Sequence, residues 1–91
     1  YKIMKTGIEL ITEERIEQLE KHNWTPEHDA NHTSNELIDA ALSVLTLEDE
    51  YYPTNWDYKY FDKFCKKDLI GRLIVAGALL AAEIDRLNAL K

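Results

Sequence analysis

The chain has 91 residues, 45% of them hydrophobic and 31% charged, which is enough for one folded domain over residues 1–91 and too little for two independent cores. Its formal net charge of −6 argues against generic binding to nucleic acids or to anionic membranes, because both need a net basic surface. A single cysteine, Cys65, excludes an internal disulfide and is typical of a reducing compartment, so we expect a cytoplasmic protein.

The first expected helix ends near His22 and has two alternative starts. Thr6 and Glu9 fit a Thr-x-x-Glu capping box, whereas Thr12 would cap a shorter helix. Apolar residues recur at a spacing of three to four positions and should form the buried face of this helix. They are Ile8, Ile11 or Thr12, Ile16 and Leu19.

The segment NWTPEHDANHTSNEL, residues 23–37, joins this helix to the next one. Helix capping explains its hydroxyl and proline residues but leaves four side chains unexplained, and we expect these to contact a ligand. They are Trp24, His28, Asp29 and His32. The spacing of His28, His32 and Glu36 would suit a metal on one continuous helix. A cap at Thr33 would interrupt that helix, so no metal site is expected.

The tetrapeptide Thr33-Ser34-Asn35-Glu36 forms a second capping box and opens a helix that should reach about Leu45. Apolar residues cover most of the circumference of this helix, so it should be mostly buried. They are Leu37, Ile38, Ala40, Ala41, Leu42 and Val44.

Residues 47–67, LEDEYYPTNWDYKYFDKFCKK, form an aromatic segment that we expect as a long loop packed against the helices. Trp56 and Tyr58 offer ring faces for a nucleotide base and should form a pocket together with the Trp24 segment. Basic residues gather around the start of the next helix, where the helix N-terminus also attracts phosphate. The expected phosphate contacts are Lys66, Lys67 and Arg72.

The third expected helix runs from about Asp68 to Leu90 and contains the charge-free run LIVAGALLAA, residues 73–82. This run is about half as long as a membrane span, so we expect a buried helix and no membrane association. Two short helices and a loop should not cover it fully, so we expect copies of the chain to meet at Gly77 and Ala78. The expected fold is therefore all-α: a small, self-associating three-helix bundle with the aromatic loop between its second and third helices.

Two acidic patterns resemble the signature of the MazG-like all-α nucleotide pyrophosphohydrolases. They are EExxE at Glu13, Glu14 and Glu17, and ExxD at Glu36 and Asp39. The resemblance implies that these carboxylates hold Mg²⁺, which binds a triphosphate and helps to activate water. The same pattern occurs on any solvated helix face, so we assign no catalytic residue and expect no cofactor unless the enzyme interpretation holds.

The succession ERIEQ, NWTPEHDANH, NELIDAA, YPTNWDY and DLIGRLIVAGALLAAEIDRL covers nearly the whole chain and resembles a family of small proteins of tailed phages and prophages. In that family the second piece typically reads GWTPEHDD, NEL is usually GEL, and a second Trp often stands where this chain has Tyr58. The resemblance implies a phage-type accessory protein in the host cytoplasm. More weakly, the segment from Trp24 to Asp29, followed by LTLEDEYY, resembles the ryanodine-receptor repeat domain, whose relatives are associated with nucleotide ligands.

Together these patterns favour an accessory protein that binds a nucleotide-like ligand without catalysis. Such a protein would sequester a host signalling nucleotide and so act in anti-defence. Two alternatives stay open at this point. One is MazG-like, Mg²⁺-dependent hydrolysis of nucleoside triphosphates, and the other is an acidic inhibitor that docks on a host protein through residues 47–58.

Overall fold

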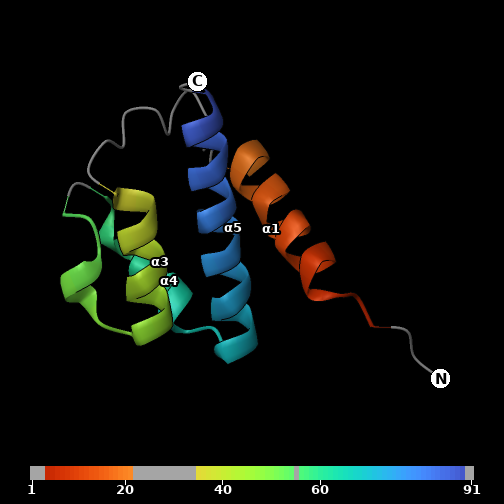
Figure 1. Cartoon of the computed structure of the whole chain (residues 1–91). Coiled ribbons are helices and arrows are strands. Elements are labelled where there is room, and N and C mark those ends of the chain that lie inside the picture. Colours follow the sequence, from red (N-terminus) through yellow and green to blue (C-terminus); the bar gives the residue numbers. More distant parts are fainter. Residues whose placement is uncertain (1–3, 22–34, 55, 90–91) are drawn as a thin grey trace.

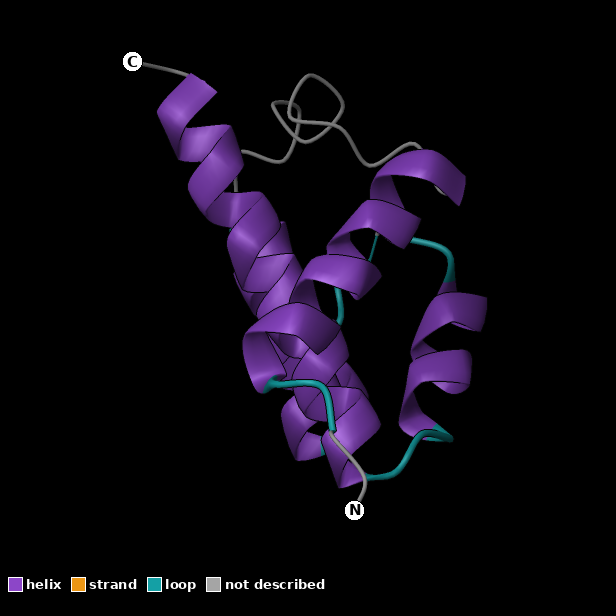
Figure 2. Ribbon diagram, turned by 90° about the vertical axis from the view of Figure 1, so that its right-hand side faces the viewer, coloured by secondary structure: helices purple, strands orange, loops and turns teal. Residues whose placement is uncertain are grey.

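The computed structural model describes residues 4–21, 35–54 and 56–89, which form four α-helices and one 3-10 helix and contain no strand (Figure 1). In chain order the elements are α1 (Gly7–Lys21), α3 (Glu36–Thr46), η1 (Asp49–Tyr51), α4 (Tyr58–Cys65) and α5 (Leu69–Ala89). Figure 2 shows the same helices from the side, with short loops linking α3, η1, α4 and α5. The all-α class is confirmed, and within the described part of the chain no helix has the length and apolarity needed to cross a membrane.

The start of α1 follows the earlier of the two expected capping boxes. The Thr6 backbone N–H donates to Glu9 Oε1 at 3.0 Å, and the Glu9 backbone N–H donates to Thr6 Oγ1 at 3.2 Å. These reciprocal bonds satisfy two of the N–H groups that a helix start leaves without an intrahelical partner. The helix therefore begins at Gly7 and not after Thr12.

The start of α3 differs from the expected one. Asn35 occupies the position before the first helical residue, in the left-handed region with φ of 64°, and its side chain makes no capping hydrogen bond. Asparagine tolerates this backbone conformation better than most residues do. Glu36 is consequently the first residue of the helix and not the third, as the Thr33 capping box required; Thr33 itself lies outside the described residues.

The segment between α3 and α5 is not a plain loop, because it contains η1 and α4. The Asp57 side chain caps α4 by accepting a hydrogen bond from the Lys59 backbone N–H at 3.0 Å. Phe61 and Phe64, three residues apart, lie buried on one face of the helix. Aromatic residues have modest helix propensity, so packing of this face against the core stabilises α4 where the local sequence does not specify it clearly.

The core lies between α3, α4 and α5, and its residues are mostly small and aliphatic. It consists of Leu37, Ala40, Ala41, Val44, Phe64, Val75, Ala76, Leu79 and Ala82. Alanines on α3 and α5 let the two helix backbones approach closely. In Figure 1, α5 stands between α3 on one side and α1 on the other, so α5 is the central helix that the sequence predicted.

Helix α1 packs mainly against α5, through a face that includes Ile11 of the expected apolar stripe but is centred on polar residues. Its buried side chains are Arg15 and Gln18, and Arg15 Nη2 donates to Asp85 Oδ2 on α5 at 3.3 Å. Ile8 and Ile16, expected in the buried face, are 79% and 45% exposed. The rotation of α1 therefore lets Arg15 pair with Asp85 of α5, and it leaves much of the expected apolar face exposed to solvent.

Gly77 and Ala78 were expected at a contact between copies of the chain. In the structure both residues pack within the single chain. Ala78 is fully buried. A Cβ atom on Gly77 would lie 2.6 Å from Ile11 Cδ1, so the missing side chain is what lets α1 approach α5 at this level. These small residues therefore lie in contacts within the single chain, and association between copies stays a prediction.

Candidate functional site

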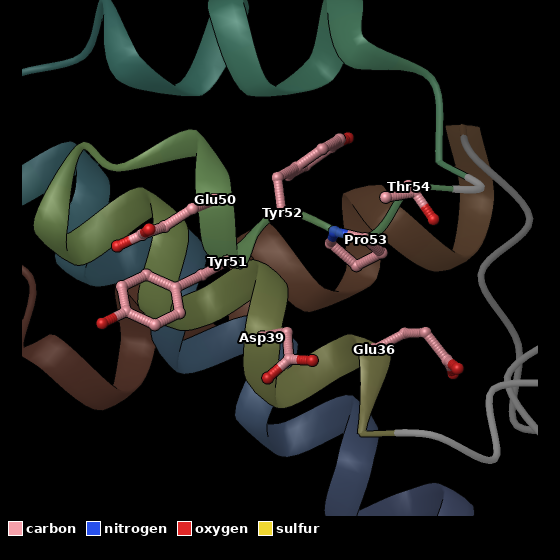
Figure 3. A pocket seen from close by; sticks show the side chains of 7 residues that line it. All are labelled: Glu36, Asp39, Glu50, Tyr51, Tyr52, Pro53 and Thr54. Carbon is pink, nitrogen blue, oxygen red and sulfur yellow. The ribbon is translucent and has the colours of Figure 1, made fainter.

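An open cavity of about 390 Å³ lies where the start of α3 meets the segment that follows η1 (Figure 3). Seven residues line this cavity, which we call the α3–η1 pocket: Glu36, Asp39, Glu50, Tyr51, Tyr52, Pro53 and Thr54. Figure 3 shows Glu36 and Asp39 on one side and Glu50 and Tyr51 on the other. The volume lies within the range of small-molecule and side-chain binding sites.

A chain reversal after α3 creates this pocket. The helix ends at Thr46, and Leu47 adopts the left-handed region with φ of 62°, which turns the chain back on itself. The short helix η1 then packs beside α3. As a result, residues 50–54 lie next to Glu36 and Asp39, which precede them by more than ten positions in the sequence.

Two tyrosine hydroxyls hold this segment in place. Tyr58 Oη donates to Asp49 Oδ2 at 2.9 Å, and this hydrogen bond raises the pKa of Tyr58. Tyr52 Oη donates to the Asp57 carbonyl at 2.8 Å, and burial raises the pKa of Tyr52 well above its ordinary value. In Figure 3 the Tyr52 ring is directed away from the pocket toward α4, where it meets the Trp56 ring edge-on at a centroid distance of 6.0 Å. The η1 side of the pocket is therefore anchored to α4 before any ligand arrives.

The pocket is negatively charged. Three of its seven lining residues are carboxylates, and none of the described lining residues is basic. The Glu48 carboxylate, through a hydrogen bond and its charge, raises the pKa of Glu50, and Asp49 adds to the shift. Glu36 and Asp39 lie in the first turn of α3, where the partial positive charge of the helix N-terminus favours acidic side chains. The arrangement suits a cation and disfavours phosphate.

Among the residues predicted to bind a nucleotide, those that the structure describes do not line this pocket. Trp24, His28, Asp29 and His32 lie outside the described residues. Among the others, Trp56 packs against the core, while the Tyr58 hydroxyl is engaged with Asp49 as described above. Lys66 and Lys67 are exposed at the opposite end of α4 from Trp56.

The start of α5 is also occupied by groups of the chain itself. Arg72 Nη1 donates to the carbonyl oxygens of Val44 and Leu45, each at 3.3 Å, so its guanidinium group caps the C-terminal end of α3. The Asp68 carboxylate accepts a hydrogen bond from the Gly71 backbone N–H at 2.8 Å. The Asp68 carboxylate therefore lies at the start of α5, where the sequence predicted that a phosphate group would bind.

The two halves of the MazG-like pattern lie on different helices that do not converge. Glu13 and Glu17 belong to α1, and Glu13 forms an ion pair with Lys5. Glu36 and Asp39 belong to α3, on the other side of α5 (Figure 1). Within the described ranges, no group of three or more His, Cys, Asp or Glu side chains is placed to hold a metal ion.

The pocket unites residues that the sequence had suggested for two different functions. Glu36 and Asp39 belong to the pattern that suggested a MazG-like enzyme. Residues 47–58 were the expected docking segment of an acidic inhibitor. Their proximity depends on the reversal of the chain at Leu47. Neither glycine nor asparagine stands at this position to indicate the turn in the sequence. No protein-family model, curated protein or solved structure matches the chain.

Proposed function

We propose that this chain is a non-catalytic binding protein whose α3–η1 pocket receives an arginine side chain of a basic protein partner. The observation that carries the proposal is that three carboxylates and the exposed Tyr51 ring line one open cavity. A guanidinium group forms paired hydrogen bonds with carboxylates and stacks on aromatic rings, so arginine suits this lining better than lysine does.

The charge of the whole chain supports the same partner. With a net charge of −6, the chain attracts a basic surface over distances longer than the pocket itself, which speeds encounter. The tyrosine hydrogen bonds that anchor η1 reduce the ordering required on binding. In the phage context that the sequence resemblance implies, the partner is a basic host protein and this chain is its acidic inhibitor.

The proposal is tested by calorimetric titration with a short arginine-rich peptide. Asp39→Asn removes one charge from the pocket and should weaken binding about tenfold, which corresponds to about 1.4 kcal/mol. Glu20→Gln changes the net charge equally at an exposed position of α1 and should leave the affinity nearly unchanged. Equal effects of the two substitutions would show that the peptide responds only to net charge, and the proposal would be wrong.

The choice of arginine over lysine has its own test. Tyr51→Leu keeps apolar bulk at the pocket but removes the ring face on which a guanidinium group stacks. The wild-type protein should bind the arginine peptide more tightly than a lysine peptide of equal length, and Tyr51→Leu should reduce that preference. If Tyr51→Leu left the preference for arginine over lysine unchanged, the Tyr51 ring would not be the group that distinguishes the two side chains.

The nucleotide interpretation stays a separate prediction. A nucleotide at about 100 times its dissociation constant should stabilise the fold by about 2.7 kcal/mol, which a thermal-shift screen of nucleotides detects. If a nucleotide stabilised the wild-type chain but not the double variant Lys66→Glu/Lys67→Glu, that result would favour nucleotide binding over the binding of an arginine side chain.

A further inference from the structure

Helix α5 exposes a continuous row of apolar side chains along the side that faces away from the core. Ile70, Leu73, Leu80, Ile84 and Leu87 are all exposed, with Ile84 60% accessible to solvent. Together with Gly77 they follow one another at alternating spacings of three and four residues, the repeat by which a helix presents one seam to another helix. The row spans most of α5, about 25 Å at 1.5 Å per residue.

Helix α1 exposes its own apolar row on the same side of the molecule. The two helices run in the same direction and diverge toward the start of α1 (Figure 1). The contacts of Ile11 with Gly77 and of Arg15 with Asp85 fix how each helix is rotated. At about 100° per residue, Ile8, Thr12 and Ile16 turn toward the side of the α1–α5 pair on which the α5 row lies. This row contains part of the stripe that sequence periodicity predicted to be buried, and its three residues are exposed in the single chain.

We propose that a second copy of this chain covers the face formed by these two rows, which we call the α1–α5 face, through a two-fold axis perpendicular to the helices. An axis at the level between Ala78 and Leu79 places Leu73 opposite the partner's Ile84 and Ile70 opposite the partner's Leu87, so branched apolar side chains meet at both levels. None of the residues of either row carries a charge.

The row on α1 has the same centre. Because Ile11 contacts Gly77, the axis passes α1 at about Thr12, and it places Ile8 opposite the partner's Ile16. Two independent rows that are symmetric about one level make the face complementary to itself, as a two-fold interface requires. A partner of different sequence would not explain this coincidence.

The size of the face is that of a weak, reversible dimer. Its rows extend about 25 Å along α5 and about 12 Å along α1, so a width of about 10 Å for each helix gives roughly 370 Å² for each copy, or about 740 Å² for two copies. Because both copies carry a net charge of −6, added salt should strengthen the dimer by screening their repulsion. Binding of an arginine peptide to the α3–η1 pocket should instead weaken with salt, so the two proposals stand or fall separately.

Sedimentation equilibrium of the wild-type chain over the micromolar range tests the proposal. The expected result is a reversible dimer of the 10.6 kDa chain. Ile84→Asp should leave only monomer, whereas Ile38→Asp, at an exposed isoleucine of α3 outside the face, should still dimerise. Circular dichroism verifies that both variants remain helical. A wild-type chain that stays monomeric over the whole range overturns the proposal.

A charge exchange tests the two-fold arrangement itself. Ile8→Lys alone and Ile16→Glu alone should each reduce dimerisation, because each places a charge in the interface. The double variant Ile8→Lys/Ile16→Glu should recover it, because every new lysine then faces a new glutamate of the partner subunit. Failure of the double variant to recover dimerisation, while Ile84→Asp still abolishes it, would overturn the proposed register.

Discussion

Arg72 links two helices of the core, because its guanidinium group donates to the last carbonyl groups of α3. Replacing it with methionine keeps most of the aliphatic stem but removes both hydrogen bonds. We expect Arg72→Met to lower the free energy of unfolding by about 1 kcal/mol in urea denaturation. Lys66→Met, at an exposed position, should leave it unchanged. If Arg72→Met left stability intact but removed a nucleotide-dependent thermal shift, a phosphate role for Arg72 would be supported instead.

Glu50 makes the protein sensitive to pH at the pocket. Its neighbours Glu48 and Asp49 raise its pKa above the ordinary value of 4.5, so the folded chain binds its proton more tightly than the unfolded chain does. The resulting stabilisation is fully present below the unfolded pKa and is lost as pH rises through the raised pKa. Glu50→Gln should therefore raise the melting temperature at neutral pH and have little effect below pH 4.5. A variant that destabilises the protein at neutral pH would contradict this.

At the scale of the helices, the end of α3 carries backbone strain. Leu47 is exposed and has a positive φ of 62°, a conformation that costs a residue with a Cβ atom about 1 kcal/mol relative to glycine. We therefore expect Leu47→Gly to raise the free energy of unfolding by about this amount while preserving the pocket. Leu45→Gly, two residues earlier within the helix, should lower it instead. Destabilisation by Leu47→Gly would show that its side chain makes contacts that outweigh the strain.

The contact between α1 and α5 depends on the pairing of Ile11 with Gly77. Gly77→Ala gains helix propensity of about 1 kcal/mol but forces its new methyl group against Ile11, and overpacking of this kind costs about 1 to 3 kcal/mol. We expect Gly77→Ala to be neutral or destabilising in the wild-type chain and stabilising together with Ile11→Val, which removes Cδ1. A double-mutant cycle in urea measures this coupling, and additive effects would mean that the helices do not meet there.

The sequence predicted three of the helices closely, because their local signals agree with their packing. Thr6 with Glu9 marks the start of α1, and the long apolar run marks α5 as central. It did not predict α4, whose aromatic residues gain their stability from the core and not from helix propensity. It also misjudged part of the face of α1, because Arg15 pairs with Asp85 of α5, a partner that is known only once the helices are packed.

At the scale of the whole molecule, the candidate site could be predicted only in pieces. The acidic residues of α3 and the segment 47–58 each stood out, but joining them required the turn at Leu47, where neither glycine nor asparagine signals a positive φ. The expected pocket between the Trp24 segment and Trp56 stays a prediction, since Trp24 lies outside the described residues. The α3–η1 pocket and the α1–α5 face lie on different helices, so binding a basic partner and pairing of two copies are compatible.

The most direct test of the proposed function is an NMR titration of the labelled protein with an arginine-rich peptide, followed through its backbone amide signals. The proposal predicts that the shifts concentrate at the start of α3 and at residues 50–54, while the exposed acidic face of α1 around Glu13 and Glu20 shifts little. Shifts of similar size along α1, or shifts centred on Lys66 and Lys67 with none at Asp39, would contradict it.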